Sequence, residues 1–404
     1  MKKAIILTTI FLFLISCGEE KREIEKIDFS TDYKFTSEIE DKVAKDTTPW
    51  KYQMSAADFA SKGDYKNALR HWDLAMGTSK KYYNQSQTDS INSLYKKISA
   101  KEYIINKAKD ERIIIINEAH HSSHHRFFTK SLLKELFELG YKNLGLEALG
   151  NGEYLDTLLM ERKYPYQETG WYIIEPQFGN LVREALEIGF NVFPYEQTSG
   201  SNGKPREIEQ AKNISKIIKQ KPNDKFLIHC GFDHALEGTH GSWEKAMAGR
   251  VKEYTGIDPL TINQVVYSEK SKPEFNNRFL KALNPTKSIV LVNNENQPFK
   301  YQRGQAWSDL AILHPLTEYL DNRPDWVFSN GNQKTEIDLS EINISYPILV
   351  MAFKKGEEIN KAVPVDIYEV LDKTENCFLG LGKGDYIIVL TNGTESLKFN
   401  KKVK

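Results

Sequence analysis

Short hydrophobic runs alternate with amphipathic stretches over residues 104–270. The run RIIIIN at 112–117 is dominated by isoleucine, which is typical of a strand whose two faces are both buried. Residues 128–140 instead repeat apolar side chains at helical spacing and end at Gly140, a residue that favours helix termination. The same patterns predict further strands at 144–149, 191–196, 225–231 and 260–267, and further helices at 178–188 and 206–220. Strands that alternate with helices predict an α/β fold with a mainly parallel sheet flanked by helices.

Two flanking regions depart from this alternation. Residues 50–103 place small and aromatic side chains at helical spacing around a Gly63-Asp64-Tyr65 turn, and this resembles one tetratricopeptide repeat. One repeat cannot bury its own apolar face, so we expect a helical cap on the next domain; a peptide-binding array is the alternative. Residues 340–404 consist of short alternating segments separated by glycine turns, which predicts a small β-sandwich or barrel.

The N-terminus has the parts of an export signal. Met1-Lys2-Lys3 precedes an apolar run at 4–16 that is too short to span a membrane. The LISC sequence that ends at Cys17 resembles the lipobox of bacterial lipoproteins. This resemblance implies cleavage before Cys17, lipid attachment to its thiol and a lipid-anchored position in the cell envelope, at the outer membrane. The alternative is an ordinary secretory signal with an incidental cysteine.

Composition limits the partners and the domain count. Lys plus Arg and Asp plus Glu both total 55, and this balance argues against a nucleic-acid surface and against polybasic membrane attachment. Beyond Cys17 the chain has only Cys230 and Cys377, too few for a disulfide framework. A chain of 404 residues can form two or three domains. We predict a signal at 1–16, a charged tether at 17–49, a helical cap at 50–103, an α/β domain at 104–330 and a β region at 340–404.

Polar side chains gather where the predicted strands end. They are Asn117 to Arg126 after the first strand, Glu147 at the second, Tyr195 and Glu196 at the third, and His229 with Gly231 to His234 at the fourth. Ligands of open parallel sheets bind beyond the carboxyl ends of the strands. Six of the nine histidines belong to two of these segments, namely His120, His121, His124, His125, His229 and His234. We therefore expect one site at this edge of the sheet.

Four residues are the catalytic candidates: Glu118, His120, Glu147 and His234. Two carboxylates and two imidazoles at one sheet edge shift each other's pKa values, and shifted pKa values are typical of working sites. Arg126 and Glu196 are the candidate substrate contacts, since the guanidinium fork suits a carboxylate or phosphate.

Some of these residues also have structural explanations. Glu147 and Glu196 could instead favour the N-terminus of the following helix. His124 and His125 could lie on the first turn of a surface helix and face solvent without a function.

The chain from about 105 to 270 resembles a superfamily. Asn117-Glu118-Ala119-His120 is similar to the Gly-Glu-x-His start of erythromycin esterase-like proteins and of the ChaN-like haem-binding lipoproteins. Glu147 matches their second acidic position, Arg206 to Ala211 their arginine-led helix, and Gly231 to His234 their closing Gly-x-x-His. The TraB/TIKI group, which includes metal-dependent peptidases, shares this skeleton. Asn117 replaces the usual glycine, the histidine cluster is longer than usual, and no macrolide-binding region is recognisable.

Three functions follow from the residues and the resemblance. The first is a hydrolase without a covalent nucleophile, since no Gly-x-Ser-x-Gly is present. By analogy with the esterase branch, His120 would take a proton from water, Glu118 and Glu147 would orient it, and His234 would stabilise the oxygen or protonate the leaving group. The substrate would be a small molecule or a peptide.

The second function is a zinc-like metal site formed by His120, His121 and His234, or a haem site, with or without catalysis. The third is a binding module for glycans or envelope partners that has no catalytic activity.

Overall fold

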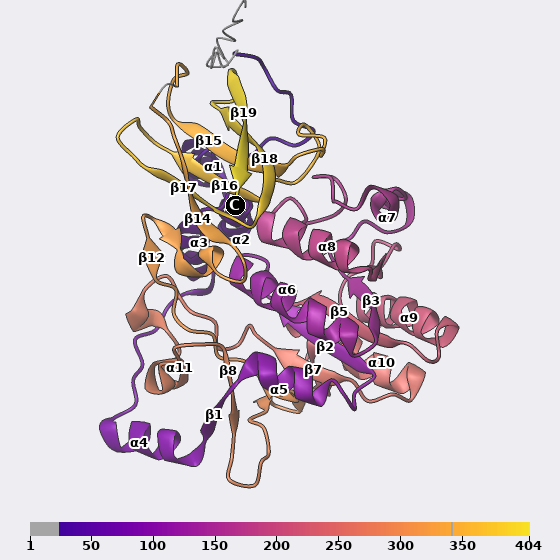
Figure 1. Cartoon of the computed structure of the whole chain (residues 1–404). Coiled ribbons are helices and arrows are strands. Elements are labelled where there is room, and N and C mark those ends of the chain that lie inside the picture. The colour runs from indigo at the N-terminus through magenta and orange to yellow at the C-terminus, as the bar shows by residue number, and fades with distance from the viewer. Residues whose placement is uncertain (1–23, 341) are drawn as a thin grey trace, which may run out of the picture.

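The computed structural model describes residues 24–340 and 342–404 (Figure 1). The predicted signal and Cys17 lie outside these residues. None of the helices in the described ranges is long and apolar enough to cross a membrane. A six-stranded sheet forms the centre of the fold, with the strand order β11-β7-β2-β5-β3-β4. Each of its five strand pairings is parallel, so the predicted α/β fold with a mainly parallel sheet is confirmed.

The strands of this sheet are short. Their bounds are β2 Ile113–Glu118, β3 Tyr141–Leu146, β4 Asn191–Pro194, β5 Lys225–Gly231, β7 Leu260–Asn263 and β11 Leu310–Ala311. The helices around it are α5 Ala100–Lys107, α6 Ser123–Glu138, α7 Leu159–Arg162, α8 Pro176–Ile188, α9 Lys204–Gln220, α10 Met247–Thr255 and α11 Arg278–Leu283.

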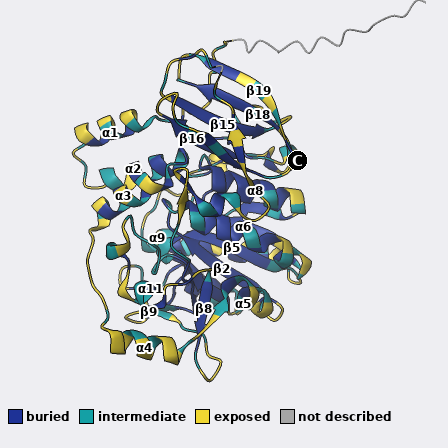
Figure 2. Ribbon diagram, turned by 60° about the vertical axis from the view of Figure 1, so that its left-hand side comes forward, coloured by how far each residue is buried: buried dark blue, intermediate teal, exposed yellow. Residues whose placement is uncertain are grey.

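Helices cover both faces of the sheet, and Figure 2 shows its strands buried beneath them. Ile114 and Ile116 of β2 belong to the apolar cluster formed with α6 and α8. Ile113 and Ile115 belong to the opposite cluster, formed with α9 and α10. Because successive side chains of a strand point to opposite faces, a run of isoleucines is the sequence that such a strand requires.

Several predicted boundaries differ from the structure. Strand β3 ends at Leu146, so Glu147 follows the strand instead of lying within it. Helix α6 begins at Ser123, five residues before the predicted start, because its polar first turn is buried by tertiary contacts that apolar periodicity cannot reveal. Strand β11, with only two residues, was not predicted.

The N-terminal part is helical: α1 Thr36–Lys45, α2 Lys51–Ser61, α3 Tyr65–Met76 and α4 Gln85–Leu94. The tether predicted for 17–49 is folded from Tyr33 onward, since Tyr33, Ile39 and Val43 are buried. Helices α2 and α3 form a pair joined by the expected turn, in which the Asp64 side chain accepts a hydrogen bond from the Asn67 amide at 3.1 Å.

The C-terminal region is antiparallel. Its main sheet has the order β16-β15-β18-β19, with β15 Ile348–Lys354, β16 Asp366–Val370, β18 Gly384–Thr391 and β19 Ser396–Val403. The pair β14 Gln333–Ile337 and β17 Cys377–Leu381 shares one apolar cluster with this sheet. Shorter strands complete the fold, namely β1 Lys96–Ser99, β6 Glu237–Gly238, β8 Ile289–Val292, β9 Tyr301–Arg303, β10 Ala306–Ser308, β12 Tyr319–Leu320 and β13 Arg323–Pro324.

The helix pair packs tightly on the C-terminal sheet. The buried guanidinium of Arg323 in β13 donates to the Gly63 carbonyl of the α2–α3 turn at 3.4 Å, to Asp366 at 2.5 and 2.6 Å, and to the Ile367 carbonyl at 3.0 Å, so it links this turn to β16. Buried Lys62 pairs with Glu369. Gly63 has φ of +77°, and a Cβ there would lie 2.2 Å from the Ile367 carbonyl oxygen. Only glycine permits this approach.

We expect Gly63→Ala to destabilise the fold more than Gly77→Ala. Both glycines have φ near +75°, so each alanine should cost about 1–2 kcal/mol of backbone strain. A Cβ at Gly77 meets nothing within 4 Å, whereas the clash at Gly63 should add at least about 1 kcal/mol. Urea unfolding of both variants measures the difference, and equal losses would mean that the Gly63 contact does not matter.

Candidate functional site

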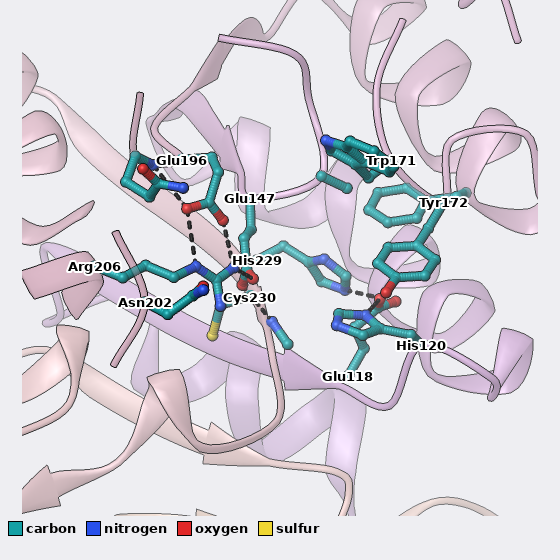
Figure 3. Close-up of a pocket in the computed structure, with 14 residues that line it drawn as sticks. Glu118, His120, Glu147, Trp171, Tyr172, Glu196, Asn202, Arg206, His229 and Cys230 are labelled. Carbon is teal, nitrogen blue, oxygen red and sulfur yellow. Dashed lines mark hydrogen bonds and ion pairs between the residues drawn. The ribbon is translucent and has the colours of Figure 1, made fainter. Parts of the chain in front are cut away.

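A pocket of about 360 Å³ opens at the carboxyl edge of the parallel sheet (Figure 3). Four strands contribute the residues at their ends: Glu118 as the last residue of β2 with His120 after it, Glu147 after β3, Glu196 after β4, and His229 to Gly231 from β5. Arg206 from α9 and the Trp171-Tyr172 loop complete its walls. Glu118, His120, Glu147 and Glu196 therefore share one pocket, as the order of the strand ends predicts.

Glu118 is a buried carboxylate held by Arg126. The guanidinium donates from Nη2 to Oε1 at 2.8 Å and from Nε to Oε2, and its Nη1 donates to Glu175 at 3.0 Å. Burial alone would raise the pKa of Glu118, but the charge and hydrogen bonds of Arg126 hold that pKa well below its usual range. Glu118 is thus ionised despite its burial.

His120 is oriented by this carboxylate. Its Nδ1 lies 2.9 Å from Glu118 Oε1, and its Nε2 has no hydrogen-bond partner among residues 24–340 and 342–404. The ring stacks on Tyr172 with centroids 4.1 Å apart and meets Phe232 edge-on at 4.9 Å. A Cβ at Gly231 would lie 2.5 Å from His120 Cε1, so only glycine leaves room for the ring.

The backbone around His120 is strained. Tyr172 and Phe232, the two aromatic residues that contact its ring, have φ of +61° and +42°. Such values are rare for residues with a large side chain, and they persist where the surrounding structure imposes them. The orientation of the imidazole is therefore fixed from three sides.

Arg206 is the centre of a second network. Its Nη2 donates to Glu147 at 2.6 Å, and its Nε donates to Glu196 at 2.9 Å. Glu147 also accepts a hydrogen bond from the Gly231 amide at 2.7 Å. Because His120 lies against Gly231, the two networks meet at this glycine.

His234 supports the second network from behind the pocket wall. It is buried, its Nε2 lies 3.1 Å from Arg206 Nη1, and its Nδ1 lies 2.9 Å from Glu207. Burial would lower the pKa of His234, but the carboxylates of Glu147 and Glu207 raise it overall. His234 is not among the residues that line the pocket.

Sequence reasoning noted His229 but did not select it. This imidazole lines the pocket, is 1% exposed, and its Nε2 has no hydrogen-bond partner within the described ranges. Its Nε2 lies 3.9 Å from Glu118 Oε2. Burial lowers the pKa of His229 to about 4, so the ring is neutral near pH 7. The sequence feature that could have identified His229 is its position as a lone histidine near the carboxyl end of an apolar strand.

Arg206, Trp171 and Tyr172 are among the other pocket residues that were not selected from the sequence. Arg206 was noted only as the start of a helix, and its role depends on two glutamates that follow other strands. Trp171 is 75% exposed at the pocket and Tyr172 stacks on His120, yet both belong to a loop without periodicity.

Arg126 has a different place from the one expected. It was predicted to contact substrate, but it is fully buried beneath the pocket, where it bonds Glu118, Glu175 and the His120 carbonyl. The structure therefore gives it a positioning role.

The histidines in the segment directly after His120 do not line the pocket either. His121 stacks on Trp72 with centroids 4.1 Å apart, and it does not converge with His120 and His234. In the part of the chain that the structure describes, no group of three His, Cys, Asp or Glu side chains is placed to hold a metal ion.

The alternative in which His124 and His125 face solvent does not hold, because His125 is buried and His124 is partly buried. His124 stacks on Trp326, with centroids 5.2 Å apart. His125 is buried, accepts a hydrogen bond from the Ala119 amide at Nδ1 (3.0 Å) and has its Nε2 3.0 Å from Ser268 Oγ. It thereby fixes the turn between Glu118 and His120.

Asn117, the residue before Glu118 in β2, joins two loops. Its Nδ2 donates to the Phe232 carbonyl at 2.7 Å, and its Oδ1 accepts from the Gln264 amide at 2.7 Å. The asparagine thus connects the ends of β5 and β7 beside the pocket.

Comparison with known proteins finds no match in sequence and only weak similarities in structure. No family model matches the sequence, and no curated protein matches it. The fold is similar to that of the type III effector HopBA1, with a TM-score of 0.33 and 12% identity over 55% of this chain and 96% of that one. It is also similar to RRSP, a MARTX toxin effector domain from Vibrio vulnificus, with a TM-score of 0.31 and 14% identity over 55% of this chain and 48% of that one.

We expect His125 to make the fold sensitive to acid. Burial lowers its pKa to about 3, below that of an unfolded histidine, about 6.5. The unfolded chain therefore binds more protons, and stability falls as the pH drops from about 6.5 towards 3. His125 alone should remove up to about 2 kcal/mol between pH 8 and pH 5.

Urea unfolding at pH 8 and pH 5 measures this loss. His125→Asn keeps an acceptor for the Ala119 amide but does not titrate, so it should lose less between the two pH values than the parent. Ser268→Ala removes the contact of the hydroxyl with His125 Nε2 and its hydrogen bonds to the Gln264 and Val265 carbonyls, but it keeps the imidazole, so its pH dependence should match that of the parent. An unchanged pH dependence in His125→Asn would contradict the assignment.

Proposed function

We propose that the protein is a hydrolase in which His120 activates a water molecule for attack on an ester or related carbonyl. The observation that supports this most is the state of His120: Nδ1 is bound to a buried, ionised carboxylate, and Nε2 is open to the pocket. A positioned base with one nitrogen held and the other free is the arrangement that general base catalysis requires.

The proton transfers follow from this arrangement. The hydrogen bond to Glu118 keeps the Nδ1 proton in place and stabilises the imidazolium that forms when Nε2 takes a proton from water. The resulting hydroxide attacks the carbonyl carbon. His120 then returns the proton to the leaving group, so that water is consumed and an acid and an alcohol are released. The neutral imidazole of His229, whose Nε2 has no partner among the described residues, can hold the water or the substrate.

Arg206 is the group best placed to stabilise the developing oxyanion. It lines the pocket, and its side chain is 27% exposed. Nη2 donates hydrogen bonds to Glu147 and Glu196. Nη1 has two N–H groups, and its one hydrogen-bond partner among the described residues is His234, so its second N–H is available to an oxyanion. His234, Glu147 and Glu196 act through Arg206 by fixing its position. Arg206, and not the expected His234, would therefore stabilise the charge on the oxygen.

The parts outside the pocket receive more general proposals. The pair α2–α3 would be a tetratricopeptide-like cap, and the two C-terminal sheets would be a small β-sandwich domain. The packing of α2–α3 on the C-terminal sheet supports a cap more than a peptide-binding array. The resemblance to erythromycin esterase-like and ChaN-like proteins remains part of this proposal, carried by Glu118, His120, Glu147 and His234.

We expect His120→Ala to lower kcat/KM by about 10²–10⁴, the usual contribution of a general base. Hydrolysis of p-nitrophenyl acetate and butyrate measures the loss. Glu118→Gln keeps an acceptor for Nδ1 without the charge and should lose less than His120→Ala. The control is His124→Ala, which lies outside the pocket and should retain most of the activity.

Metal content and an absorption spectrum of each variant separate the alternatives. Equal activity in His120→Ala and the parent would overturn the proposed mechanism. Stoichiometric metal that is lost with His120 would favour a metal-activated water, and a haem absorption band would favour the haem-binding alternative.

We further propose that the protein is a lipoprotein anchored through Cys17. Beyond residue 16 the sequence has no apolar run long enough to cross a membrane, and the charges of the full sequence balance, so we expect no second source of membrane attachment. A cysteine that carries two or more acyl chains is a sufficient anchor. Cys17→Ser should therefore move from the membrane fraction to the soluble fraction, as fractionation and immunoblotting would show. Retention of the variant after a high-salt wash would contradict the proposal.

A further inference from the structure

A second cavity, of about 210 Å³, lies where α6 and α8 meet the C-terminal β region. Figure 1 shows these two helices next to that region. Four cations line the cavity: Lys130 from α6, Arg183 from α8, Lys354 from the end of β15, and Lys383 from the turn before β18. No residue of this cavity lines the pocket that contains His120.

The charges in this cavity do not balance. Glu184 is the carboxylate that lines it. Arg183 is held by Glu357, with Nε–Oε1 and Nη2–Oε2 distances of 2.7 and 2.8 Å, and Lys354 is held by Glu187 at 2.5 Å. Lys130 and Lys383 have no carboxylate within 4.0 Å in the described parts of the chain. Positive charge therefore remains in excess even when the paired carboxylates are counted.

Among these cations, Lys130 gives the strongest indication of an anion-binding site. Its ammonium lies 5.3 Å from the centre of the Phe127 ring, and it has no hydrogen-bond acceptor among the described residues. Lys130 is partly buried, so water still reaches its ammonium, and this burial lowers the pKa of Lys130 because the cation loses part of its hydration. A half-buried ammonium that has no acceptor among the described residues is available to an anion that displaces this water.

We propose that this cavity binds a phosphate group, either free or as a monoester of a small molecule or lipid. Lysine ammonium groups from α6 and from the turn before β18 would approach the anion from two sides, and Arg183 would contribute its guanidinium from α8. The cavity volume suits a phosphoryl group with a few further atoms. The ligand would connect the α/β part of the chain with the C-terminal β region, since the lining residues come from both.

The test uses inorganic phosphate and the full chain without its signal. Thermal unfolding in increasing phosphate, with chloride at equal ionic strength as the reference, should show a rise in Tm that saturates. Isothermal titration then gives Kd. Lys130→Gln should weaken phosphate binding by about tenfold or more, because a charge-assisted hydrogen bond is lost. Lys134→Gln is the matched control, since Lys134 is exposed on the same helix and should leave Kd unchanged.

Lys383→Gln provides a second variant if Lys130→Gln does not fold, because Lys383 is exposed and its replacement should not disturb packing. The absence of a phosphate-specific rise in Tm would overturn the proposal, and so would an equal Kd in the parent, Lys130→Gln and Lys383→Gln. Competition by glucose 6-phosphate would support a soluble monoester. Binding to vesicles that contain phosphatidic acid, lost in Lys130→Gln, would support a lipid headgroup.

Discussion

A single buried guanidinium, that of Arg126, holds the candidate site together. It extends from α6 to Glu118 at the end of β2 and to Glu175, whose carboxylate accepts the Gln177 and Phe178 amides at the start of α8. The one positive charge does not compensate both carboxylates equally, since the pKa of Glu118 is held low while burial raises that of Glu175. Loss of Arg126 would leave a buried carboxylate without compensation, which typically costs about 3–5 kcal/mol. The orientation of His120 depends on this arrangement, because Glu118 is its hydrogen-bond partner.

The sequence was sufficient for the sheet and for part of the pocket. In a parallel sheet the carboxyl ends of all strands reach one edge, so the order of strands and of the polar residues after them already places Glu118, His120, Glu147 and Glu196 together. This placement holds for any spatial order of the strands in the sheet and does not require their exact boundaries. It therefore tolerates the error of a few residues at β3.

The remaining pocket residues required information that periodicity does not contain. Arg206 belongs to the site because α9 packs where Glu147 and Glu196 end, and this depends on how the chain crosses between strands. His124 and His125 occupy a polar helical turn that looks exposed in the sequence, but Trp326 and Ser268, which lie far along the chain, bury it. Such long-range contacts also explain why Tyr33 and α1 are folded where a charged tether was predicted.

The regions outside the pocket support its wall without supplying lining residues, all of which lie between 118 and 231. Trp72 of α3 stacks on His121 at 4.1 Å and on Phe232 at 5.4 Å. Phe232 in turn meets the edge of the His120 ring and has a positive φ, a conformation that the packing of Trp72 helps to maintain. Since α3 is held through Gly63 and Lys62 on the C-terminal sheet, the position of His120 depends on contacts that extend across the whole chain. A substitution at the interface between α2–α3 and that sheet can therefore change the site without touching any residue of the pocket.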